Sequence, residues 1–151
     1  MERQKFKILI NAKPEKVWKI LWDDATYRQW TKVFSEGSRA ESDWKEGSKI
    51  LFLDGKGNGM VSKIEKLIPN KFMSFIHMGT IHEGKEDMSN KGEENWNGAI
   101  ENYTLIAKNN QTELTVEMDI DHEYKEFFEE TFPKAIQKVK ELAEKEPAVS
   151  H

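Results

Sequence analysis

The chain has 151 residues, a formal net charge of −4 and no cysteine, which excludes disulfides, thiol catalysis and thiolate metal sites. The acidic balance argues against a nucleic-acid partner, because such partners usually require a basic stripe. No apolar run approaches the ~20 residues that cross a bilayer, and no apolar signal segment begins the chain, so we expect a cytoplasmic protein without a membrane span. We expect one domain over residues 1–146 and a tail over 147–151.

The first half of the chain predicts a strand, two short helices and then a run of strands. Residues 5–10 alternate apolar and polar side chains, which is typical of a half-buried strand. Pro14 stands where a first helical turn tolerates proline and opens a short apolar helix. A second short helix is predicted at residues 25–30, with Asp23 or Asp24 as its cap. Further strands are predicted at residues 38–43, 49–53, 60–68 and 71–78.

The second half predicts a polar loop, a hairpin and a long helix. Residues 80–95 carry five acidic and two basic side chains and are longer than most connections in compact domains, so we expect a loop that covers a binding site. Strands at residues 97–107 and 112–120 form the hairpin, and the alternation of the second predicts that Leu114, Val116, Met118 and Ile120 face inward. The last helix, residues 123–144, is capped by Asp121, and its apolar residues share one stripe. They are Tyr124, Phe127, Phe128, Phe132, Ala135, Ile136, Val139, Leu142 and Ala143.

This order predicts an α+β fold in which a curved antiparallel sheet of seven strands wraps around the long C-terminal helix. Sheet and helix need not touch everywhere in such a fold, so a cavity between them is expected. A dry apolar void of about 300 Å³ would cost several kcal/mol, and a hollow of that size persists only where function or a ligand offsets the cost.

An ordered set of motifs extends over nearly the whole chain. They are residues 10–18 (Ile-Asn-Ala-Lys-Pro-Glu-Lys-Val-Trp), Trp30, Gly47, Gly59-Met60-Val61, Pro69 with Phe72, Trp96, and Thr112-Glu113-Leu114. With these motifs the chain resembles the START-like (SRPBCC) helix-grip superfamily, the fold of the birch-pollen allergen. Within it, the chain is most similar to the branch of activator of heat-shock-protein ATPase homologues. One departure is Lys13, where similar proteins often place a Ser or Asp helix cap.

The resemblance implies a hydrophobic cavity for a lipid-like or aromatic ligand, and it carries over no catalytic set. We therefore expect a small apolar ligand between the helix and the sheet. The residues that we assign to this site combine aromatic walls with a few polar groups for orientation. They are Trp30, Phe34, Phe52, Phe75, His77, Trp96, Glu101, Tyr103, Phe128 and Phe132.

Three of these residues are also candidate catalytic groups. The alternation of strand 71–78 does not decide which of its two faces points inward. If the face with His77 is inward, His77 points into the cavity, where it can act as a general base or contact a ligand. The alternative is a satisfied or exposed histidine. Glu101 and Tyr103 share a strand face and form an acid–base pair if that face is inward. Otherwise Glu101 lies outside or pairs with a cation.

Other chemistry-bearing patterns favour structural roles. The glycine-rich segment 55–59 lacks the Gly-Lys-Ser/Thr ending of a phosphate loop and predicts a hairpin turn. Asp119, Asp121 and Glu123 lack the glycine and the distal glutamate of a calcium loop. Asp119 is instead expected to point outward from its strand. We expect His82 and His122 to be solvated, and we expect no metal and no cofactor.

Two alternative functions remain open at this point. One is a cyclase-like or hydrolase-like enzyme that uses the same cavity and an inward acid or base. The other, which follows the name of the similar branch, is a co-chaperone-like interaction module with a chaperone partner.

Overall fold

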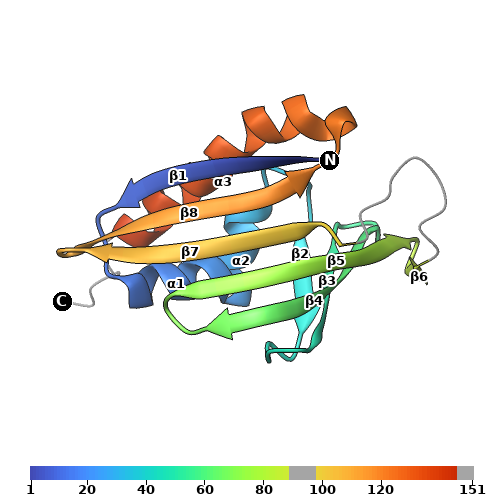
Figure 1. Cartoon of the computed structure of the whole chain (residues 1–151), viewed down its shortest axis with the longest axis horizontal. Coiled ribbons are helices and arrows are strands. Elements are labelled where there is room, and N and C mark those ends of the chain that lie inside the picture. The colour runs from blue at the N-terminus through green and yellow to red at the C-terminus, as the bar shows by residue number, and fades with distance from the viewer. Residues whose placement is uncertain (89–97, 146–151) are drawn as a thin grey trace.

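The computed structural model describes residues 1–88 and 98–145. The strands are β1 (Glu2–Ile10), β2 (Arg39–Ser42), β3 (Lys49–Leu53), β4 (Gly59–Ile68), β5 (Phe72–His82), β6 (Lys85–Asp87), β7 (Ile100–Lys108) and β8 (Gln111–Ile120). The helices are α1 (Pro14–Trp22), α2 (Asp24–Thr31) and α3 (Lys125–Glu144), and a 3-10 turn, η1 (His122–Tyr124), precedes α3. The sheet is antiparallel, in the order β1-β8-β7-β5-β4-β3-β2, with β6 beside β5. All three helices lie against one face of it (Figure 1).

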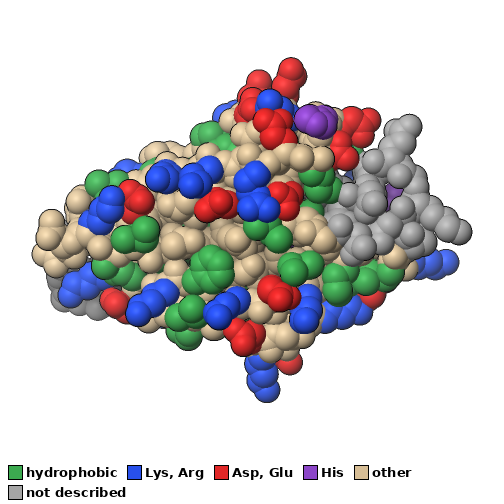
Figure 2. Space-filling view, viewed as in Figure 1, with side chains coloured by type: hydrophobic (Ala, Val, Ile, Leu, Met, Phe, Trp, Pro, Cys, Tyr) green, Lys and Arg blue, Asp and Glu red, His purple; other side chains and the backbone are tan. Residues whose placement is uncertain are grey.

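The predicted fold class is confirmed, because an antiparallel sheet wraps a long C-terminal helix and two short helices follow the first strand. All seven predicted strands occur among the described residues, and β6 adds a short eighth strand. The outer face of the sheet carries basic and acidic side chains interspersed with separate hydrophobic groups (Figure 2). Cross-strand pairs such as Arg3 with Asp119, 2.7 Å apart, belong to this face. The helix-covered face therefore holds the main core.

Helix α1 begins as the proline signal predicts, with Pro14 in the first turn. Lys13 occupies the N-cap position in an extended conformation, and its side chain makes no capping hydrogen bond. At α2 the N-cap position belongs to Asp23, as expected, but its side chain also makes no capping bond. Both helices are therefore held mainly by buried apolar groups, of which Val17 and Leu21 in α1 and Trp30 in α2 are the most enclosed.

Helix α3 buries its stripe unevenly. Its second half packs Ala135, Ile136 and Val139 against the sheet with at most 4% exposure, whereas Phe127 in its first turn is 45% exposed. Pro133 lies in the interior of the helix on its exposed side, where water can bond the carbonyl that proline leaves without a partner.

The cap predicted for α3 belongs to a different element. The Asp121 carboxylate accepts a hydrogen bond from the Glu123 N–H at 3.0 Å, which caps the 3-10 turn η1, and Tyr124 occupies the N-cap position of α3. The prediction placed the first turn of the long helix at Glu123, but that turn is wound as a 3-10 helix. Tighter 3-10 turns are frequent at the ends of α-helices.

The structure decides which face of β5 is inward. Met73, Phe75 and His77 are buried at 1%, 0% and 5%, and they point toward the helices. The register of β4 against β5 pairs Ser62 with His77 and Val61 with Gly79, so Met78 lies in an irregularity of the ladder. Such a bulge changes the direction of the residues that follow it.

The loop predicted over residues 80–95 is wrong in its first half. Strand β5 continues to His82 and turns back into β6, with positive φ angles of 49° at Glu83 and 82° at Gly84. Two central residues with positive φ are typical of a tight two-residue hairpin. The acidic composition of the segment concealed this turn. Residues 89–97, which include Trp96, lie outside the described part of the chain, as does the tail predicted at 147–151.

No helix in the described residues is long and apolar enough to cross a membrane.

The uncapped start of α1 gives a stability prediction. Replacing Lys13 by Ser supplies an oxygen that can accept a backbone N–H of the first turn, and we expect the free energy of unfolding to rise by about 0.5–1 kcal/mol. Chemical denaturation with urea measures this change. The matched control is Lys13→Ala, which removes the same charge but has no oxygen. Equal stability of the Ser and Ala variants would contradict the capping argument.

Candidate functional site

A cavity of about 530 Å³ lies between the first half of α3, helix α2 and the inner face of the sheet. Its volume falls in the range of small-molecule pockets, roughly 300–1,000 Å³. Most of its wall is apolar and aromatic. The apolar residues that line it are Trp30, Phe34, Phe52, Leu53, Met60, Met118, Ile120, Phe127, Phe128 and Phe132.

One wall is a cluster of phenylalanines from α3 and from the segment after α2. The ring of Phe34 lies 6.4 Å from that of Phe127, 6.2 Å from Phe128 and 5.1 Å from Phe132. Phe132 stacks in turn on Phe6 of β1, with ring centroids 5.1 Å apart. These contacts place three phenylalanines of the first half of α3 along one side of the cavity.

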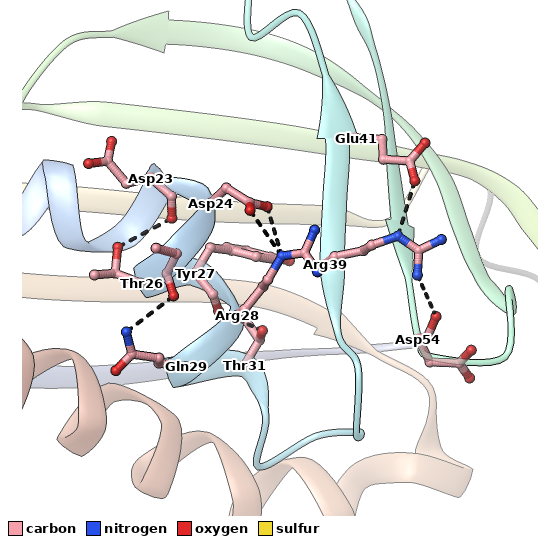
Figure 3. Close-up of polar contacts among 11 residues, drawn as sticks. Asp23, Asp24, Thr26, Tyr27, Arg28, Gln29, Thr31, Arg39, Glu41 and Asp54 are labelled. Carbon is pink, nitrogen blue, oxygen red and sulfur yellow. Dashed lines mark hydrogen bonds and ion pairs between the residues drawn. The ribbon is translucent and has the colours of Figure 1, made fainter.

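Helix α2 supplies the floor. Trp30 is 2% exposed, and its indole N–H donates to the Leu21 carbonyl at 3.1 Å, so its polar atom is satisfied and its ring is left to form the wall. Thr31 donates its hydroxyl to the Tyr27 carbonyl at 2.6 Å within the same helix. Figure 3 shows Tyr27 and Thr31 of α2 near Arg39 at the start of β2.

The glycine-rich turn between β3 and β4 borders the cavity. The Asp54 carboxylate accepts the backbone N–H groups of Lys56 at 2.8 Å and Asn58 at 3.0 Å. Burial opposes ionisation of Asp54, but these hydrogen bonds outweigh it and hold its pKa below the ordinary value. Arg39 donates to the Asp54 carbonyl at 3.1 Å (Figure 3). The segment 55–59 is thus a hairpin turn fixed by its own polar groups.

A chain of hydrogen bonds joins four polar side chains at the deep side of the cavity. Ser62 Oγ and His77 Nδ1 lie 2.6 Å apart, and His77 Nε2 lies 3.2 Å from Glu101 Oε1. Tyr103 donates its hydroxyl to Glu101 Oε2 at 2.5 Å. His77, Glu101 and Tyr103 line the cavity, whereas Ser62 is fully buried behind them.

One arrangement of protons satisfies this chain. If the Ser62 hydroxyl donates to Nδ1 of His77, the imidazole proton is on Nε2 and donates to Glu101. The Glu101 carboxylate then accepts two hydrogen bonds, from His77 and Tyr103. Its side chain is 20% exposed, compared with 6% for that of His77. Glu101 is therefore the most accessible member of this hydrogen-bonded chain.

The two buried phenols beside Glu101 stay protonated. Burial, and then the negative charge of Glu101 together with its hydrogen bond, raise the pKa of Tyr103 well above the ordinary value of 10.0. Burial and the same charge raise the pKa of Tyr27. At neutral pH both groups are therefore hydrogen-bond donors rather than acids that release a proton.

Asp119 lies at the rim of the cavity. Burial opposes its ionisation, but hydrogen bonds from Arg3, at 2.7 Å, and from the Ile100 N–H, at 3.0 Å, lower its pKa below the ordinary value. The negative charge of Asp119 is compensated by Arg3 on the outer face of the sheet, the face that the sequence predicted for Asp119. No group of three or more His, Asp or Glu side chains in the described part of the chain is arranged to hold a metal.

The structure brings most of the residues assigned to the site from sequence to this cavity, but not all. Phe75 is fully buried in the core instead, with its ring 5.0 Å from that of Phe52 and 6.2 Å from that of Tyr103. Trp96 is outside the described residues. The other assigned residues line the cavity: Trp30, Phe34, Phe52, His77, Glu101, Tyr103, Phe128 and Phe132.

The sequence analysis missed several lining residues. The alternation of the last strand predicts inward positions for Met118 and Ile120, and the helical stripe includes Phe127, so a signal existed for these three. Tyr27 and Met60 gave none, because the face of a short helix and the β-bulge between β4 and β5 decide where they point.

Comparison with known proteins gives a family and a fold. A model of the family described as "Activator of Hsp90 ATPase homolog 1-like protein" matches residues 11–144. Protein MLL2253 from Mesorhizobium loti is similar in structure, with a TM-score of 0.75, 14% identity and coverage of 97% of this chain and 99% of that chain. The Aha1 dimer from Colwellia psychrerythraea has a TM-score of 0.72 and 24% identity, covering 95% and 97%. ChR145 from Cytophaga hutchinsonii has a TM-score of 0.69 and 21% identity, covering 95% and 94%. No curated protein sequence matches the chain.

The raised pKa of Tyr103 predicts a pH dependence of stability. Above about pH 10 the unfolded chain releases phenol protons that the folded chain retains, so the free energy of unfolding should fall as the pH rises. In Tyr103→Phe this fall should be shallower by up to about 1.4 kcal/mol per pH unit, which corresponds to one proton. Urea denaturation between about pH 9 and 11 measures both slopes.

Lysines also titrate in this range, but they are the same in both proteins, so the difference between the two slopes isolates Tyr103. The lost hydrogen bond to Glu101 lowers stability of the variant by about 1 kcal/mol over the whole range and leaves the slope unchanged. Identical slopes would contradict the retained proton.

Proposed function

The chain belongs to the Activator of Hsp90 ATPase homolog 1-like family, and we propose that it binds a small hydrophobic molecule, lipid-like or aromatic, in the cavity between α3 and the sheet. A cavity that binds a ligand is typical of this fold. The observation that carries the proposal is the size and lining of the hollow, about 530 Å³ with mainly aromatic walls.

Energetics support a function for the hollow. A closed, dry apolar void of about 530 Å³ would cost on the order of 10 kcal/mol at about 24 cal/mol per Å³, and a cavity that opens to solvent costs less than that but still forfeits packing contacts. The second half of α3 buries small and branched side chains with at most 4% exposure, so the hollow is confined to the half of the helix that carries the phenylalanines. The phenylalanine wall around Phe34 instead leaves flat apolar surfaces facing the space.

The mouth of the cavity also supports the proposal. Phe127 is a large apolar side chain with 45% exposure at the start of α3, and it lines the same cavity as Asp54 and Asn58 of the β3–β4 turn. An apolar ring kept at the edge of a hollow can contact a molecule that enters it. We therefore place the entrance between the first turn of α3 and the segment 55–59.

Filling the cavity tests the proposal. Met60 lines the cavity from β4, and Met60→Trp should occupy part of the space and weaken binding of the neutral apolar fluorophore N-phenyl-1-naphthylamine at least about tenfold. We expect the wild-type protein to bind one molecule of this probe in the micromolar range. Fluorescence titration measures the affinity, and native mass spectrometry against a denatured control gives the stoichiometry and detects any copurified ligand.

The matched control is Ile106→Trp, which adds the same indole at a position that is 45% exposed on the outer face of β7 and should leave the affinity unchanged. Circular dichroism establishes that both variants are folded. Failure of the wild-type protein to bind any apolar probe, or equal binding by Met60→Trp, would overturn the assignment of the cavity as the binding site.

A second candidate function, an enzyme on the same cavity, is favoured by one observation. Glu101 presents a carboxylate to an apolar space, with its orientation fixed by His77 and Tyr103, and a group of this kind can accept a proton from a bound molecule. If the protein is an enzyme, a bound molecule should be chemically changed after long incubation with the wild-type protein and unchanged after incubation with Glu101→Gln. Unaltered recovery in both cases would leave binding as the function. The co-chaperone alternative rests on the family name alone, and no feature of the described residues supports it further.

A further inference from the structure

We propose that the molecule bound in this cavity is a hydrophobic amine, whose ammonium group lies against Glu101 while its apolar body contacts the phenylalanine wall. This inference rests on the proposed function and specifies the charge of its ligand. Three features of the described residues carry it: the sign of the charges that line the cavity, the way each charge is compensated, and the aromatic surroundings.

The charges that line the cavity are of one sign. The charged residues among the described lining are Asp54, Glu101 and Asp119, without a Lys or Arg, and of these the Asp119 carboxylate is turned to Arg3 on the outer face. A ligand carboxylate or phosphate would enter this space against like charges, without a cation to meet it. Bringing like charges together in a desolvated site is costly, so hydrophobic acids are disfavoured.

Two of the three carboxylates already have compensating partners. Asp119 is paired with Arg3 at 2.7 Å, and Asp54 accepts the backbone N–H groups of its own turn. A further cation would therefore stabilise neither carboxylate much. The charge that remains for a ligand is that of Glu101.

The Glu101 carboxylate accepts fewer hydrogen bonds than it can, and its negative charge is not compensated by a Lys or Arg of the described chain. A carboxylate can accept about four hydrogen bonds, and His77 and Tyr103 supply two. In the arrangement in which the Ser62 hydroxyl donates to Nδ1 of His77, both are neutral donors. Within the described chain, no Lys or Arg forms an ion pair with Glu101. A half-buried carboxylate without a cation is costly, and a bound ammonium would remove that cost.

The surroundings of Glu101 suit a cation as well. Tyr103 stands beside it on β7, and Trp30 packs on Tyr103 with ring centroids 6.2 Å apart. Tyr27 lies close enough for the charge of Glu101 to raise its pKa. Aromatic faces attract an ammonium that lies within about 6 Å of the ring centroid. A carboxylate with aromatic rings around it is the combination that recognises organic cations.

A set of three probes with the same aromatic body tests the inference: 1-naphthylmethylamine, the neutral 1-naphthylmethanol and the anionic 1-naphthoate. Competition against N-phenyl-1-naphthylamine at neutral pH, where the amine is charged, gives the three affinities. We expect the amine to bind about tenfold to a hundredfold more tightly than the alcohol, the difference expected for a charge-assisted hydrogen bond, and the acid to bind most weakly.

Two variants that each change one carboxylate to an amide locate the effect. Glu101→Gln should bring the affinity of the amine down to that of the alcohol and leave the affinity of the alcohol within about threefold of its value in the wild-type protein. Asp119→Asn, the matched control at the rim, should keep the preference for the amine because Arg3 already compensates that charge.

The outcomes separate this inference from the proposed function. If the alcohol binds as tightly as the amine in the wild-type protein, the cavity binds apolar molecules and the charge inference is overturned. If Asp119→Asn loses the preference and Glu101→Gln keeps it, the assignment to Glu101 is overturned. If no probe binds, the proposed function fails together with the inference. The comparison in the wild-type protein holds even where a variant does not fold.

Discussion

The structure depends on how one helix fits a sheet that is wider than the helix can cover. The second half of α3 presents Ala135, Val139 and Ala143. Their side chains are small and fully buried, which lets this half of the helix pack closely. The first half presents phenylalanines, whose rings contact Phe34 and line the cavity. The closely packed half and the half with large side chains thus differ, and the space lies beside the latter. The cavity is thus a consequence of side-chain size along one helix.

The polar chain behind the cavity is compatible with this core because its members satisfy one another. An unpaired hydroxyl or imidazole in such surroundings would cost several kcal/mol. Ser62 and His77 come from β4 and β5, and Glu101 and Tyr103 from β7, so the hydrogen bonds cross the sheet and fix the relative positions of three strands. A carboxylate held in this way keeps its direction when the cavity is empty, and a ligand need not organise it.

Family membership and ligand chemistry are decided by different parts of the molecule. The neighbours with TM-scores near 0.7 share the architecture at identities of 14–24%, which shows that the fold tolerates replacement of most side chains. The fold provides the space between helix and sheet. The charge that lines this space depends on a few side chains, above all Glu101.

The sequence by itself determined the order of elements, since hydrophobic periodicity and signals such as Pro14 depend on neighbours along the chain. It also determined the inward face of β8, where Leu114, Val116 and Met118 alternate with polar residues. It could not decide the inward face of β5, because apolar residues occupy both faces of that strand and only its pairing with β4 and β7 separates them. The contact of His77 with Glu101 was decided in the same way, since it joins residues 24 positions apart. Tertiary structure decided the site because its polar groups come from strands that meet only after the sheet has formed.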